Sequence, residues 1–148
     1  MHHELTGVTV RFVAGFGPVT RETPASKAFY VDTLGLPLRH MDGNSDYLLT
    51  ENEALKGVKH FALWPLSQAA LSCFGSENWP ETVPVPQAWI EFEVEDIAGA
   101  TDTLCNRGYQ LLVAERTEPW GQTVTRLLSP EGLLTGITIT PWLREDNA

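Results

Sequence analysis

Residues 89–113 read WIEFEVEDIAGATDTLCNRGYQLLV, and this stretch predicts a strand, a helix and a second strand in that order. Apolar residues occupy every second position from 90 to 94, which is the pattern of a strand with one buried face. Asp96 then stands where a helix needs an N-cap acceptor, and Gly108 suits the left-handed conformation that often ends a helix. The apolar residues 111–113 begin the second strand.

The same layout occurs earlier in the chain. An apolar strand at residues 8–16 is followed by a helix at 24–34, by Gly35 and by a strand at 36–39. Short apolar runs bounded by turn residues predict further strands in both halves, at residues 47–50, 58–66, 123–128 and 133–140. Each half therefore reads β-α-β-β-β, and the predicted fold class is α+β.

The two units are of comparable size and fit one domain that spans residues 1–148. Module one covers about residues 8–66 and module two about residues 88–143. The segment 67–87 between them contains three prolines among polar residues, so we predict a linker there. A chain of 148 residues is long enough to build a real core, because such a size buries about 70% of its unfolded surface.

Charge and hydropathy exclude some partners. The net charge of −9 argues against nucleic acid, whose phosphates require a basic surface, and is compatible with a cationic small molecule. No apolar run approaches the roughly 20 residues that cross a bilayer, so no membrane partner is expected. Residues 1–4 read MHHE and lack the basic start of a secretory signal, so we expect a cytoplasmic protein.

Three short motifs, in order, resemble those of one protein family. They are FYVDTLGL at residues 29–36, FEVED at 92–96, and SPEG at 129–132, where Ser129 replaces the usual aspartate. Together with Trp120-Gly121 they resemble the vicinal oxygen chelate superfamily, which includes glyoxalase I, extradiol dioxygenases and bleomycin-resistance proteins. The resemblance implies two βαβββ modules whose curved mixed sheets surround a shared concave cavity, and a symmetric homodimer.

The resemblance also implies where a metal would be held. In this superfamily the ligands come from the first strand of a half and from the strand after the last turn motif. Carried over by spacing, these positions fall at Gly15, Trp89 and Gly136, and none of these residues can ligate a divalent metal. We therefore expect a metal-less branch without a cofactor. A displaced site, in which His60 joins Glu91 or Glu93, stays open.

Strand parity predicts which side chains face the cavity, because alternate residues point to opposite faces of a sheet. The candidate ligand-binding residues are Trp64, Trp89, Glu91, Glu93, Trp120 and His60. Indole faces and carboxylates would suit a flat or cationic ligand. Alternatively, the tryptophans supply core or dimer interface and the two glutamates face solvent.

Three functions remain compatible with the sequence. The leading hypothesis is a binding protein of the bleomycin-resistance type, which sequesters a small aromatic or cationic compound without metal. The second is a lyase, isomerase or dioxygenase of the superfamily, with displaced metal ligands or with Glu91 or Glu93 as a metal-free base. The third is a partner-binding module with a vestigial cavity. The sequence does not decide whether the cleft lies within one chain or across a dimer.

Overall fold

The computed structural model describes residues 7–51 and 54–144. The N-terminal residues considered for localisation lie outside these ranges. The first module contains β1 (Val10–Thr20), α1 (Thr23–Lys27), the π-helical turn η2 (Ala28–Thr33), β2 (Leu38–Met41), β3 (Asn44–Thr50) and β4 (Ala62–Pro65). Pro24 lies in the first turn of α1, where its missing N–H costs no hydrogen bond.

The second module repeats this order. It contains β5 (Ala88–Val94), α3 (Ile97–Asn106), β6 (Val113–Thr117), β7 (Thr123–Leu128), β8 (Leu134–Ile139) and the closing 3₁₀ turn η3 (Pro141–Leu143). The side chain of Asp96 accepts a hydrogen bond of 3.1 Å from the Gly99 N–H, so the predicted helix cap is confirmed.

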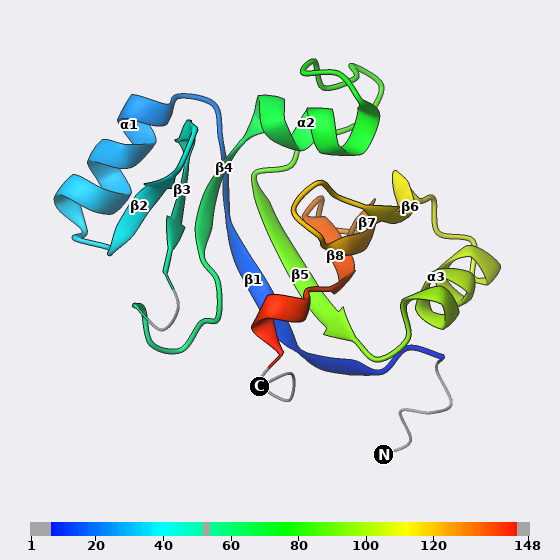
Figure 1. The fold of residues 1–148 in the computed structure, drawn as a ribbon. Coiled ribbons are helices and arrows are strands. Elements are labelled where there is room, and N and C mark those ends of the chain that lie inside the picture. Colours follow the sequence, from blue (N-terminus) through cyan, green and yellow to red (C-terminus); the bar gives the residue numbers. More distant parts are fainter. Residues whose placement is uncertain (1–6, 52–53, 145–148) are drawn as a thin grey trace.

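The strands of both modules join into one open, curved, mixed sheet in the order β2-β3-β4-β1-β5-β8-β7-β6 (Figure 1). The central pair, β1 and β5, is antiparallel, whereas β1 runs parallel to β4 and β5 runs parallel to β8. The predicted α+β fold of two βαβββ modules is therefore confirmed. In the described part of the chain, no helix is long and apolar enough to cross a membrane.

The segment predicted as a linker is partly helical. Residues Leu66–Phe74 form the nine-residue helix α2, which begins directly after β4. Ala69, Ala70 and Cys73 are buried on one face of this helix, and Gly75 ends it with a φ of +75°. The prolines that suggested an irregular linker all lie beyond this helix.

The predicted alternation of side chains between the two faces of the sheet is observed in the strands that border the cavity. Phe61 and Leu63 pack with Leu38 and Leu48 under the first-module helix, and Val94 packs with Ala100 of α3. Regular pairing of β4 begins only at Ala62, although a strand was predicted from residue 58. The alternate side chains of these strands therefore lie on the opposite face, toward the space between the modules.

A row of four residues crosses the centre of the sheet. Gly15 lies opposite Glu91, Glu91 opposite Gly136, and Gly136 opposite Arg126. A Cβ at Gly15 would lie 2.8 Å from the His60 carbonyl oxygen, and one at Gly136 would lie 2.8 Å from Glu91 Cγ. Both contacts are closer than real Cβ atoms allow, so glycine at these positions leaves room for the Glu91 side chain and for the backbone at His60.

Candidate ligand-binding site

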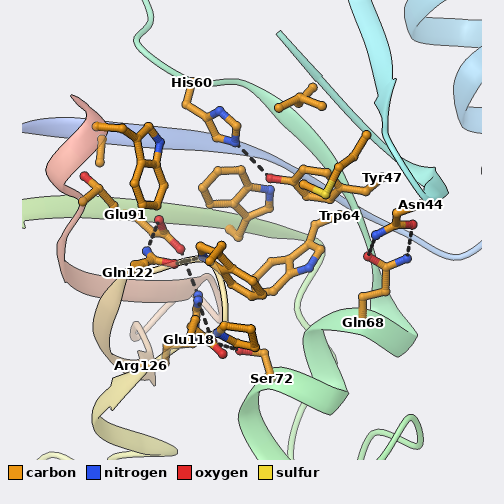
Figure 2. A pocket seen from close by; sticks show the side chains of 18 of the residues that line it. Asn44, Tyr47, His60, Trp64, Gln68, Ser72, Glu91, Glu118, Gln122 and Arg126 are labelled. Atoms are coloured by element: carbon orange, nitrogen blue, oxygen red, sulfur yellow. Dashed lines mark hydrogen bonds and ion pairs between the residues drawn. The ribbon is translucent and has the colours of Figure 1, made fainter. Parts of the chain in front are cut away.

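A cavity of about 520 Å³ lies between the two modules (Figure 2). Strands β1, β3, β4, β5 and β7 supply side chains to its walls, and α2, the loop after β6 and the turn η3 border it. Its size falls in the ordinary range of small-molecule sites, roughly 300–1,000 Å³.

Aromatic rings form one wall of the cavity. The rings of Trp64 and Trp89 meet edge to face, with centroids 6.1 Å apart, and Trp89 also lies 6.0 Å from the His60 ring. The Trp89 Nε1–H donates a 3.1 Å hydrogen bond to the Ala62 carbonyl oxygen, which satisfies the buried indole. Both tryptophans belong to the core as well as to the cavity, with exposed fractions of 7% and 4%.

A tyrosine and a histidine form a polar pair at the cavity. The Tyr47 hydroxyl lies 2.9 Å from Nε2 of His60, and their rings are stacked. Burial lowers the pKa of His60 below its ordinary value, and the nearby Glu91 carboxylate offsets only part of this effect. Burial also raises the pKa of Tyr47. Near neutral pH the pair is therefore an uncharged imidazole beside an uncharged phenol.

The cavity floor holds a buried ion cluster. Arg126 is 1% exposed and its guanidinium lies between two carboxylates: Nη1 is 2.9 Å from Glu91 and Nη2 is 3.5 Å from Glu118. The guanidinium carbon also lies 4.8 Å from the centre of the Trp64 ring, a cation–π contact. The Arg126 Nε–H has no hydrogen-bond partner among the described residues.

Further polar groups fix the two carboxylates. Gln122 Nε2 donates to Glu91 at 2.9 Å, and the Gln122 carbonyl accepts a 2.8 Å hydrogen bond from the Trp120 indole. Glu118 accepts a hydrogen bond from the Ser72 hydroxyl and lies 3.5 Å from Arg116 Nε. The labelled side chains in Figure 2 show this network, which joins β5, β7 and α2.

The comparisons with known proteins decide the family. A family model described as the Glyoxalase/Bleomycin resistance protein/Dioxygenase superfamily matches residues 16–137. The chain belongs to this superfamily. No curated protein matches the chain.

Solved structures of this superfamily show the same fold. A member from Vibrio splendidus 12B01 has 16% identity and a TM-score of 0.54, over 88% of this chain and 98% of that one. A methylmalonyl-CoA epimerase in complex with methylmalonyl-CoA and NH4+ has 18% identity and a TM-score of 0.56, over 92% and 99%. A variant methylmalonyl-CoA epimerase from Streptomyces coelicolor has 18% identity and a TM-score of 0.57, over 93% and 99%.

The superfamily's metal positions are not suited to a divalent ion in this chain. We predicted them at Gly15, Trp89 and Gly136, but the sheet register places Glu91, not Trp89, opposite Gly15. Glu91 is a carboxylate, yet it is already bound to Arg126, whose positive charge would repel a second cation. Within residues 7–51 and 54–144, no group of three or more His, Cys, Asp or Glu residues could hold a metal.

The structure corrects the expected place of Glu93. Its side chain is fully buried, and it accepts hydrogen bonds from the Thr140 N–H, the Thr140 hydroxyl and Arg144 Nε. The C-terminal turn covers this carboxylate, so it does not border the cavity. Parity gave the correct face of β5, but it could not show that a distant segment packs over one end of that face.

The other predicted residues are brought together. His60, Trp64, Trp89, Glu91 and Trp120 all border the cavity. Trp120 is 51% exposed and lies at the rim, where a loop residue was expected.

Sequence reasoning missed further residues of the site, among them Arg126, Tyr47, Glu118, Gln122 and Trp142. Arg126 left a signal, because it is a charged residue inside the otherwise uncharged strand β7. The others gave no comparable signal: Glu118, Gln122 and Trp142 depend on how the loop after β6 and the turn η3 fold back, and Tyr47 depends on the pairing of β3 with β4.

Proposed function

We propose that this protein binds a small aromatic molecule in the cavity between its modules and does so without a divalent metal. The observation that carries the proposal is the Arg126 guanidinium, which lies between Glu91 and Glu118 and against the Trp64 ring. A cation supplied by the chain itself neutralises carboxylates that would otherwise attract a metal. The cavity surface is otherwise mainly apolar and includes aromatic rings, to which a flat ring can bind by stacking and burial.

The charge balance favours an aromatic ligand over a strongly cationic one. Glu91 and Glu118 both contact Arg126, and Glu118 also faces Arg116, so the two carboxylates are matched by two guanidiniums. An acidic chain with a net charge of −9 still steers a cation toward its surface, but the cavity itself offers little uncompensated negative charge.

Proton-transfer catalysis is a second candidate, which one observation favours. The neutral imidazole of His60 lies in the cavity, 2.9 Å from the Tyr47 hydroxyl, and an unprotonated imidazole can accept a proton from a bound molecule. The methylmalonyl-CoA epimerases of similar fold show that the superfamily contains enzymes. Turnover of a bound compound that stops in His60→Gln would favour this candidate over sequestration.

Tryptophan fluorescence and melting temperature test the proposed function against a panel of aromatic compounds. We expect at least one compound to quench fluorescence and raise the melting temperature stoichiometrically. Replacing the rim residue in Trp120→Phe should reduce the quenching, whereas the matched variant Trp79→Phe should not, because Trp79 lies outside the cavity. Stoichiometric Zn, Ni, Mn or Fe in protein purified without chelator, or no response to any compound, would overturn the proposal.

A further inference from the structure

Resting on the proposed function, we propose that the ligand is an aromatic molecule carrying an N–H or O–H group, which donates a hydrogen bond to the carboxylate of Glu91. Phenols, indoles and aromatic amines share this chemistry. Neither the fold nor the family determines this class of ligand.

Glu91 has unused hydrogen-bonding capacity that faces the cavity. An ionised carboxylate can accept about four hydrogen bonds. The described residues supply two, from Arg126 Nη1 and from Gln122 Nε2, both at 2.9 Å. The side chain of Glu91 is 12% exposed and borders the cavity, and Figure 2 shows it projecting among the lining side chains. A ligand donor can therefore complete its coordination.

Two members of the ion cluster, Arg126 and Glu118, are closed to a ligand, whereas Arg116 is 42% exposed and borders the cavity. The side chains of Arg126 and Glu118 are each 1% exposed, and both are held by partners within the cluster. Of Arg126, Glu118 and Glu91, the last is thus the one that a ligand can reach. It repels an anionic or purely accepting group, so the Glu91 position selects for a donor.

The side-chain amide of Gln122, next to Glu91, cannot reverse this preference for a hydrogen-bond donor. The Nε2 group of Gln122 donates to both Glu91 and Thr138, while its carbonyl oxygen accepts from the Trp120 indole. Rotating the amide would place its oxygen against the Glu91 carboxylate and its nitrogen against an N–H group. The network therefore fixes Glu91 as an acceptor within the apolar and aromatic wall of the cavity.

A pair of ligands of equal shape tests the proposal on the unmodified protein. Indole and benzofuran differ in one ring atom, N–H against O, and both fit the cavity. We expect indole to bind roughly 10-fold or more tightly, as measured by fluorescence titration or calorimetry, because a hydrogen bond to a charged acceptor is lost in benzofuran. Equal affinity for the two compounds would overturn the proposal.

Two variants identify the acceptor. Glu91→Gln should reduce the preference for indole over benzofuran several-fold, because a neutral amide oxygen is a weaker acceptor than a carboxylate. The matched variant Glu118→Gln removes the same charge from the surroundings of Arg126 without touching a reachable acceptor, so the preference should persist. The ratio of two affinities measured on each folded variant is insensitive to a general loss of stability. An undiminished preference in Glu91→Gln would overturn the proposal.

A charged pair separates hydrogen bonding from charge attraction. Protonated 2-phenylethylamine carries N–H donors, whereas its N,N,N-trimethyl derivative keeps the charge without a donor. We expect only the first to bind appreciably, and equal binding would overturn the requirement for a donor. If benzofuran binds in the cavity as well as indole does, this inference fails while the proposed function stands. If no aromatic compound binds, the proposed function fails as well.

Discussion

Arg126 carries a positive charge in the interior with its side chain 1% exposed. Its removal would leave Glu91 and Glu118 buried near one another without their shared cation. We therefore expect Arg126→Met to lower the free energy of unfolding by about 3–5 kcal/mol, measured by urea denaturation. Arg116→Met is the matched control: Arg116 also faces Glu118, but it is 42% exposed, so its loss should cost about 1 kcal/mol or less. Equal effects of the two variants would contradict the central role of Arg126.

Two tryptophans of the same cavity should behave differently on truncation. Trp89 is 4% exposed and belongs to the core, so Trp89→Ala should lower the free energy of unfolding by about 3–5 kcal/mol. Trp120 is 51% exposed at the rim, so Trp120→Ala should change stability by about 0.5 kcal/mol or less while weakening ligand binding by at least about 1 kcal/mol. Chemical denaturation and ligand titration on each variant check both values. Undiminished affinity in Trp120→Ala would remove that indole from the site.

At the scale of elements, Glu93 of β5 holds the turn η3 beside the cavity. Glu93 accepts hydrogen bonds from Thr140, directly before η3, and from Arg144, directly after it, while Trp142 within the turn borders the cavity. We expect Glu93→Gln to cost about 1.5–3 kcal/mol and to speed amide hydrogen exchange in η3. Glu95→Gln is the matched control, since Glu95 is 54% exposed in a surface ion pair. Unchanged exchange in Glu93→Gln would show that other contacts hold the turn.

The sequence predicts a helix or strand well where residues close together in the chain determine it. The alternation in β5, the Asp96 cap and the glycines after the helices have local causes, and the structure agrees with them. Helix α2 was missed because the prolines farther along that segment suggested an irregular linker. The cluster around Arg126 was missed because its partners come from β5 and from the loop after β6, and only the tertiary fold brings them together.

At the scale of the whole molecule, the cavity makes stability depend on pH through His60. Burial lowers the pKa of this histidine in the folded protein, so the unfolded chain binds a proton more readily. Above the ordinary pKa of 6.5, His60 is neutral in both the folded and the unfolded protein, and protonation does not reduce the stability. As the pH falls below 6.5 toward the lower pKa of the folded state, the unfolded chain is protonated first, and stability is lost. The slope for one group is at most about 1.4 kcal/mol per pH unit. We expect the free energy of unfolding, measured by urea denaturation between about pH 7.5 and 5.5, to fall more steeply for the unmodified protein than for His60→Gln. Glutamine keeps a polar partner for the Tyr47 hydroxyl but does not titrate, so parallel pH profiles would show that His60 is protonated equally in both states.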